Sequence, residues 1–171
     1  MARIAIFYPT DPIGFVPSGI DSFIRGILKW SPKDLHYTLF GATTDPRVRP
    51  LNEAISLPGL HHSGRFVTLV AADPSARRSQ IPLTVRYMWA LGKYLRNRSL
   101  ASYDILDFHR LEPVILFRGD PRPKNLVLHQ DMSVIREPSS DIMWRHLPWL
   151  YERVEKYLFR SVDHVFCVRQ S

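Results

Sequence analysis

Residues 3 to 28 read RIAIFYPTDPIGFVPSGIDSFIRGIL, and this stretch decides the fold. Its first part is an apolar run that predicts a short strand ending near Tyr8. A Pro- and Gly-containing loop follows and ends at Ser18 and Gly19. Apolar residues then recur at helical spacing and predict an amphipathic helix over residues 20–30. The residues on its apolar face are Ile20, Phe23, Ile24, Ile27 and Leu28.

The start of this helix has the chemistry of an anion site. Ser18 is a good N-cap, and Asp21, three residues on, can complete a capping box. In an open α/β sheet such a junction lies at the carboxyl end of a strand, where ligands bind. Free backbone N–H groups at a helix start favour an anion such as a phosphate. A plain strand-to-helix connection without a ligand is the alternative interpretation.

The rest of the chain alternates between strands and helices. The apolar runs predict strands at 36–40, 66–70, 105–108, 125–129 and 164–168, helices at 82–98 and 147–159, a short helix or turn at 112–117, and a loop at 44–64 with a short extended piece at 54–57. In the helix at 82–98, four residues are expected on one side: Val85, Met88, Leu91 and Leu95. Short strands that are apolar on both faces predict an α/β, Rossmann-like, three-layer domain with a mostly parallel sheet.

Composition limits the class of protein. The 171 residues suffice for one domain, which we expect to span 1–171, and a net charge of +7 with a pI of about 9.9 favours acidic partners. Cys167 is the single cysteine, so no intrachain disulfide forms and a cytoplasmic setting is the simplest inference. It lies in the apolar run HVFCV and is expected to be buried. No apolar run approaches the length of a membrane span.

Common catalytic and cofactor motifs are absent from the sequence. It contains no GxxxxGK[ST] phosphate loop, no GxGxxG after the first strand and no GxSxG elbow. It also lacks HExxH and CxxC patterns, so we expect no metal site. These absences count against nucleotide hydrolases, dehydrogenases, serine hydrolases and metalloenzymes.

Polar residues follow two of the predicted strands directly. His109 comes directly after the strand at 105–108. His129 lies at the end of the strand at 125–129, and Asp131 follows it. Because parallel strands end at one edge of a sheet, these side chains should lie at the same edge as Gly19. They could hydrogen-bond sugar hydroxyls or a phosphate there. A purely structural role for each histidine is the alternative.

The ordered set of these segments resembles the N-terminal domain of GT-B glycosyltransferases, specifically glycosyltransferase family 4. The similar segments, which span nearly the whole chain in the family's order, are PSGIDSFIRGIL at 17–28, YDILDFH at 103–109, LVLHQD at 126–131 and YLFRSVDHVFCV at 157–168. The resemblance implies transfer of a sugar from a nucleotide-sugar co-substrate to a glycan or lipid-linked acceptor with retention of anomeric configuration. It implies no required metal or other cofactor.

The resemblance also implies roles for individual residues. Gly19 matches the second glycine of the family's Gly-Gly loop, near the donor phosphate, while Ser18 replaces the first glycine. His109 matches the catalytic-site histidine near the transferred sugar, and His129 with Asp131 matches a His-Asp pair on the acceptor side. The chain would then be an acceptor-side half whose C-terminal, donor-binding domain is absent. By itself it is expected to show no transfer activity and at best weak donor binding.

Two further hypotheses concern the positive charge. The helix at 82–98 combines basic and aromatic residues and could lie on an anionic membrane, which would make the protein peripheral at the inner membrane face. The basic residues expected to face the membrane are Arg86, Lys93 and Arg96, interleaved with Tyr87, Trp89 and Tyr94. The alternative is a solvated outer face with the aromatic residues packed inward. The alternative to transferase activity is a non-catalytic nucleotide- or nucleic-acid-binding α/β module, although no nucleic-acid-reading motif is present.

Overall fold

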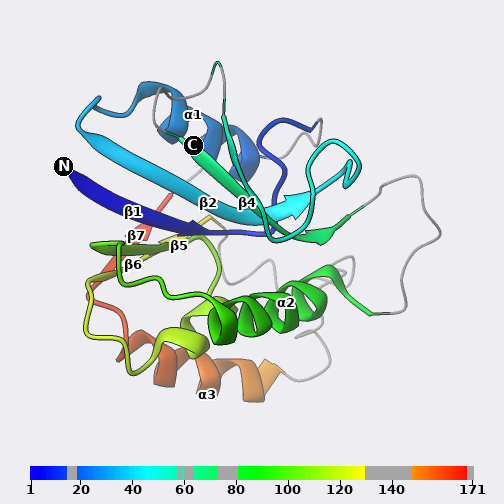
Figure 1. Ribbon diagram of the computed structural model, residues 1–171. Coiled ribbons are helices and arrows are strands. Elements are labelled where there is room, and N and C mark those ends of the chain that lie inside the picture. The colour runs from blue at the N-terminus through cyan, green and yellow to red at the C-terminus, as the bar shows by residue number, and fades with distance from the viewer. Residues whose placement is uncertain (15–18, 58, 60–63, 73–80, 130–147, 169–171) are drawn as a thin grey trace.

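The computed structural model describes residues 1–14, 19–57, 59, 64–72, 81–129 and 148–168. Its elements alternate as the sequence predicts (Figure 1). They are β1 Ala2–Phe7, α1 Gly19–Trp30, β2 Leu35–Thr43, β3 Ala54–Ser56, β4 Arg65–Ala71, α2 Leu83–Asn97, β5 Ile105–Phe108, the 3-10 helix η1 Glu112–Phe117, β6 Lys124–Leu128, α3 Pro148–Phe159 and β7 His164–Cys167.

Within the described residues the strands form one seven-stranded sheet in the order β3-β4-β2-β1-β5-β6-β7. All neighbours are parallel except β3, which is antiparallel to β4. The chain builds outward from β1 through β2 and β4, and then crosses to β5 on the other side of β1. The sheet therefore has a topological switch point between β1 and β5, which is where open α/β sheets bind ligands.

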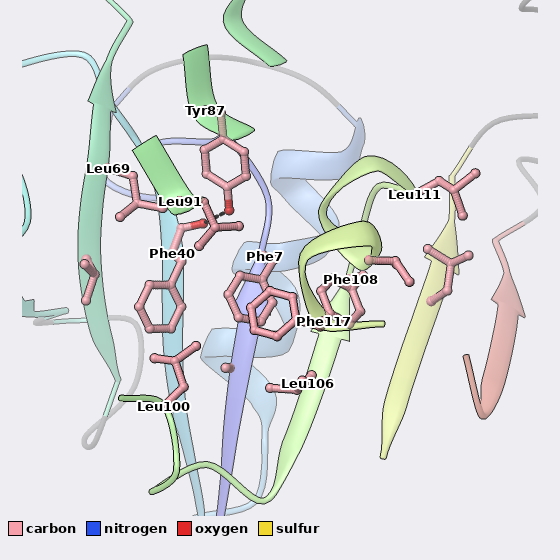
Figure 2. Packing of buried hydrophobic residues seen from close by; sticks show 14 of the residues in the cluster. Phe7, Phe40, Leu69, Tyr87, Leu91, Leu100, Leu106, Phe108, Leu111 and Phe117 are labelled. Carbon is pink, nitrogen blue, oxygen red and sulfur yellow. Dashed lines mark hydrogen bonds between the residues drawn. The ribbon is translucent and has the colours of Figure 1, made fainter. Parts of the chain in front are cut away.

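Side chains of β1 alternate between two cores, one on each face of the sheet. Ile4 and Ile6 pack under α1, whereas Ala5 and Phe7 point into the larger core beneath α2 and α3 (Figures 1 and 2). Phe7 lies at the centre of that larger core, with ring centroids 5.2 Å from Phe40 and 5.1 Å from Phe108. Helices thus cover both faces, and the predicted three-layer Rossmann-like α/β fold is confirmed.

β2, at Leu35–Thr43, is longer than the strand predicted at 36–40. The strand continues to Thr43 through a register shift between Gly41 and Ala42, where the backbone N–H of Ala42 donates to the carbonyl oxygen of Thr10. A Cβ at Gly41 would meet that carbonyl and the ring of Phe66. The missing side chain therefore lets the segment after β1 run close beside β2.

The inner face of α2 agrees with the prediction in part, since Leu91 is buried and Leu95 packs against the larger core as expected. Tyr87 and Leu91 are fully buried, and the Tyr87 hydroxyl donates to the Phe40 carbonyl over 2.7 Å (Figure 2). Val85, predicted to lie inward, is exposed. At 100° per residue, a face centred on Tyr87 and Leu91 turns Val85 and Trp89 outward.

The prediction that Cys167 is buried is wrong. Cys167 belongs to β7, the edge strand of the sheet, and its thiol is free and exposed. All four β7 residues are exposed, including Phe166 at 53%. An apolar run shows where a strand forms, but burial also depends on what is packed over that strand.

Among the described residues, no helix has the length and apolar character required to span a membrane.

Candidate functional site at the carboxyl edge of the sheet

The sequence-predicted site residues follow neighbouring strands of the sheet. Gly19 is the first residue of α1, which comes after β1, while His109 follows β5 and His129 follows β6. Because β1, β5 and β6 are consecutive in the sheet, their carboxyl ends share one edge. The backbone N–H of His109 donates to the carbonyl of Phe7, which fixes His109 at the switch point. Ser18 and Asp131 lie outside the described residues.

The two histidines are in direct contact. Nδ1 of His109 and Nε2 of His129 are 2.7 Å apart, a hydrogen-bond distance, and the rings stack with centroids 5.0 Å apart. Phe23 of α1 packs against both imidazoles, with ring centroids 5.9 Å from His109 and 4.9 Å from His129. The second turn of the helix that begins at Gly19 is therefore part of the same site as the histidine pair.

His109 is held in a buried position beside a carboxylate. Its side chain is 0% exposed, and its Nε2 atom, 3.6 Å from Oδ2 of Asp107, has no hydrogen-bond partner among the described residues. Asp107 precedes Phe108 on β5, so strand alternation places it on the same face as α1. A buried imidazole nitrogen next to a carboxylate makes His109 a candidate for a functional group.

His129 is neutral at physiological pH. Its pKa is lowered from 6.5 to about 4, mainly by burial and also by the charge of the nearby His109, while the charge of Asp107 opposes the change. Desolvation disfavours the imidazolium because the charged form loses more hydration than the neutral form. His129 therefore presents hydrogen-bonding nitrogens rather than a positive charge.

Tyr8 adds a phenol to this edge. It follows β1 directly, and its ring centroid is 6.3 Å from that of His109. Burial raises the pKa of Tyr8 to about 12, the charge of Arg110 lowers it, and the charges of Asp21 and Glu112 raise it. The hydroxyl therefore keeps its proton. Sequence reasoning missed Tyr8, although its position right after a strand was the same signal that identified His109.

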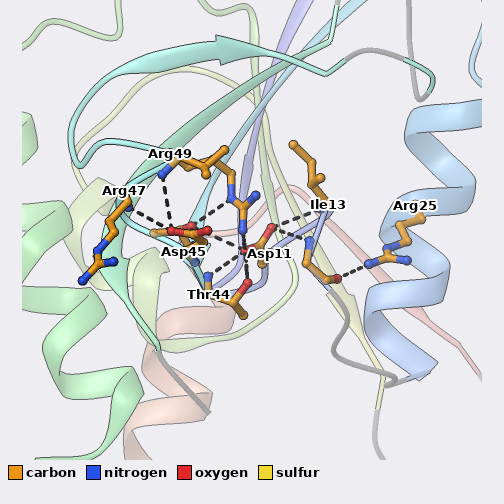
Figure 3. Close-up of polar contacts among 10 residues, drawn as sticks. Asp11, Ile13, Arg25, Thr44, Asp45, Arg47 and Arg49 are labelled. Atoms are coloured by element: carbon orange, nitrogen blue, oxygen red, sulfur yellow. Dashed lines mark hydrogen bonds and ion pairs between the residues drawn. The ribbon is translucent and has the colours of Figure 1, made fainter. Parts of the chain in front are cut away.

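A second polar cluster, formed by Asp11, Thr43, Thr44 and Arg49, lies at the ends of β1 and β2 (Figure 3). Asp11 Oδ2 accepts from the Thr44 backbone N–H at 2.7 Å, from the Thr44 hydroxyl at 2.8 Å and from Arg49 Nη2 at 2.8 Å. Its other oxygen accepts from the backbone N–H of Gly14 at 2.7 Å. This cluster was not predicted from the sequence.

Burial alone would raise the pKa of Asp11. The hydrogen bonds from Thr44 and Gly14 and the charge of Arg49 outweigh that effect and hold the pKa below its ordinary value. Asp11 is therefore an ionised acceptor at neutral pH, and its role is to fix the loop that leads from β1 towards α1.

Further contacts attach the same loop to α1. The Thr10 hydroxyl donates to the buried carboxylate of Asp21. Arg25 donates to the carbonyl of Gly14 (Figure 3). The capping box expected for Asp21 involves Ser18, which lies outside the described residues. Asp21 and Arg25 thus tie the first turns of α1 to the end of β1.

The basic residues of α2 are not part of this site. Lys93 and Arg96 are exposed on α2, and Lys93 lies 5.6 Å above the Trp89 ring. Arg86 donates to the carbonyl of Ala71, so its guanidinium is engaged with the end of β4. Within the described residues, no group of three or more His, Cys, Asp or Glu side chains is placed to hold a metal ion.

No family model and no curated protein sequence matches this chain. Solved structures do. The sucrose-phosphate synthase of Thermosynechococcus elongatus aligns with a TM-score of 0.62 at 15% identity, over 96% of this chain and 42% of that protein. A UGT transferase of Siraitia grosvenorii, solved in complex with UDP, aligns with a TM-score of 0.51 at 11% identity. The alignment covers 96% of this chain and 44% of the UGT transferase chain.

The chain therefore spans less than half the length of either structure that it resembles. Family 4, within the GT-B glycosyltransferases, stays a prediction from the sequence. The fold itself is shown: the chain has a Rossmann-like α/β fold similar to part of each of these two structures.

Proposed function

We propose that this chain is the acceptor-side half of a retaining, family 4-like glycosyltransferase that moves a sugar from a nucleotide sugar to a glycan or lipid-linked acceptor. The observation that carries the proposal is the contact of His109, His129 and α1 at the switch point of the sheet. This is the position at which such folds bind ligands. The proposed setting is the cytoplasm, and the nucleotide sugar acts as a co-substrate, with no resident cofactor.

Each residue has a role in this proposal. His109 contacts the transferred sugar, and Gly19 at the start of α1 lies near the donor phosphates, with Ser18 beside it. His129 and Asp131 face the acceptor. An acceptor hydroxyl forms the new bond to the anomeric carbon while the bond from that carbon to the nucleoside diphosphate breaks. Catalysis comes from positioning and from stabilisation of the leaving-group charge.

The donor-binding half is proposed to come from outside these 171 residues. Support comes from the coverage of less than half of either similar glycosyltransferase. Calorimetry with UDP- and GDP-sugars tests this point. The isolated chain should bind them weakly or not at all, and tight binding to the chain alone would refute the two-half arrangement.

Transfer activity is tested with the full-length gene product. Release of nucleoside diphosphate is measured with a set of nucleotide sugars and acceptors, and the anomeric configuration of the product is read by NMR. His109→Ala should abolish transfer because it removes the buried imidazole at the switch point. His164→Ala is the matched control, since His164 is exposed on β7. Equal activity in the two variants, or an inverted product, would contradict the proposal.

A second element of the proposal is docking of α2 on an anionic membrane. Trp89 is 72% exposed, Val85 and Ile81 are also exposed, and α2 contains basic residues but no Asp or Glu. An exposed apolar and aromatic strip flanked by cations fits the interface of a bilayer with anionic lipids. In this arrangement Lys93 and Arg96 face the lipid headgroups, and Arg86 flanks them at the end of β4.

Sedimentation with anionic liposomes at low and high salt tests the docking. Trp89→Ala should reduce the bound fraction, and added salt should reduce it further because salt screens charge attraction. Trp30→Ala is a matched control: Trp30 is 78% exposed and also has a lysine over its ring, but it lies on α1 at the opposite face of the sheet. Equal losses in both variants would contradict docking through α2.

A further inference from the structure

Three groups form a line beneath the carboxyl edge of the sheet. Asp107 Oδ2 lies 3.6 Å from Nε2 of His109, and Nδ1 of His109 lies 2.7 Å from Nε2 of His129. The first contact is too long for a hydrogen bond but close enough for a carboxylate to act on an N–H electrostatically. The second is a hydrogen bond in which one ring donates and the other accepts.

The carboxylate determines which ring donates. A neutral imidazole carries one N–H, on either Nδ1 or Nε2. The negative charge of Asp107 favours the His109 tautomer with its proton on Nε2, because an N–H dipole is stabilised there and a lone pair is repelled. Nδ1 of His109 is then the acceptor, and Nε2 of His129 must donate the shared hydrogen. His129 is left with an unprotonated Nδ1.

The groups around the pair are compatible with this direction. Phe23 of α1 packs against both rings and excludes water from one side. Tyr8, at the end of β1, brings a protonated phenol next to His109. The charged side chains nearest to Tyr8 are Asp21 on α1 and Arg110 with Glu112 after β5, and the last two form an ion pair at 3.0 Å.

We propose that His129 recognises an uncharged hydroxyl group of the substrate through its unprotonated Nδ1, and that Asp107 is the positioning residue that fixes this polarity through His109. The inference rests on the proposed function and adds a specificity to it. A neutral acceptor nitrogen binds the O–H of a sugar or other polyol and repels the ionised oxygens of a nucleotide-sugar diphosphate, which carry no proton and have only lone pairs to offer. Within this one site, the phosphate groups of the substrate therefore bind away from the histidine pair.

The tautomers can be measured without any ligand. In protein labelled with 15N-histidine, two-bond 1H–15N spectra at pH 7 should show the proton on Nε2 in both His109 and His129. A proton on Nδ1 of His129 overturns the proposal. This measurement uses the wild-type chain and does not depend on transfer activity. Its outcome can therefore be distinguished from a failure of the proposed transferase function.

Substitution of the carboxylate tests its positioning role. Asp107→Asn should shift part of the His109 population to the Nδ1-protonated tautomer and reverse the hydrogen bond to His129. Asp104→Asn is the matched control, because Asp104 precedes the same strand, is exposed and accepts from the backbone N–H of Arg3 at 2.7 Å. Unchanged tautomers in Asp107→Asn, or an equal shift in the control, overturn the positioning role. If Asp107→Asn does not fold, the wild-type tautomers decide.

Simple probes test the specificity. Methyl α-glucoside, an uncharged polyol, should move the 15N resonance of His129 Nδ1 upfield as that nitrogen accepts a hydrogen bond. Inorganic sulfate, a tetrahedral oxyanion that carries no proton at pH 7, should leave it unchanged at the same concentration. A response to sulfate alone, or to neither compound, overturns the assignment of a hydroxyl group to His129.

Discussion

Asp11→Ala should destabilise the protein more than any other single loss of a carboxylate at the carboxyl edge. Asp11 and Arg49 form a 2.8 Å ion pair whose side chains are 2% and 9% exposed. At an effective dielectric constant of 20, their attraction is about 6 kcal/mol before desolvation is subtracted. Removing one partner of a buried pair leaves the other charge uncompensated and costs about 3–5 kcal/mol. Thr44 and Gly14 also lose an acceptor, so we expect a value of about 4 kcal/mol.

Equilibrium urea denaturation, followed by tryptophan fluorescence, measures this change in the free energy of unfolding. Asp45→Ala is the matched control, since Asp45 accepts two backbone N–H groups in the adjacent turn but no guanidinium. Its loss should cost about 1 kcal/mol. If Asp11→Ala and Asp45→Ala are equally mild, the Asp11 cluster does not fix the loop and the reasoning about it is wrong.

The remaining predictions address packing and charge. Gly41→Ala should lower stability by about 1–3 kcal/mol because its Cβ meets backbone and ring atoms. Gly26→Ala should raise stability by about 0.5–1 kcal/mol because a Cβ there has open space on α1. Thermal unfolding of both variants checks the direction of each change. Tyr87→Phe removes the buried hydroxyl that donates to the Phe40 carbonyl and should cost about 1–3 kcal/mol in urea denaturation, and no change would contradict that hydrogen bond. The pKa of His129 is lowered to about 4 in the folded protein, so the unfolded chain binds a proton on this imidazole more readily than the folded chain does. The contribution of His129 to the free energy of unfolding should therefore be complete above pH 6.5 and should fall as the pH drops towards 4. Solvent screening of this half-buried group limits the loss to about 1–2 kcal/mol, and His129→Gln should remove that part of the pH dependence.

Much of the fold could be predicted because the hydrophobic pattern of each segment agrees with its final layer. The run ending near Tyr8 and the helical spacing of Ile24 and Leu28 are local properties, and both survive in the structure as β1 and the buried face of α1. The end of β2 could not be predicted, because it depends on the Thr10 carbonyl, in the segment after β1, coming close to Gly41. The exposure of Cys167 likewise depends on packing across the sheet rather than on its own neighbours in sequence.

The site was predictable only where strand ends carry the signal. His109 and His129 were identified because each directly follows an apolar run, and parallel strands end together. Their direct hydrogen bond was not predicted, because it needs the register between β5 and β6. Asp107 was overlooked because a carboxylate within a strand is usually predicted to face solvent. In the structure its carboxylate faces the buried imidazole of His109. The pairing of Asp11 with Arg49 joins residues far apart in sequence, for which no local pattern exists.

The central claim is that the start of α1 and the histidine pair form one ligand site. An NMR titration of the full-length gene product with UDP-glucose tests it most directly. We expect the resonances of Gly19, His109 and His129 to shift together with one saturation curve, while Asp120, at the opposite edge of the sheet, stays unchanged. Shifts centred on Asp120, or shifts of the histidines without Gly19, would contradict the account.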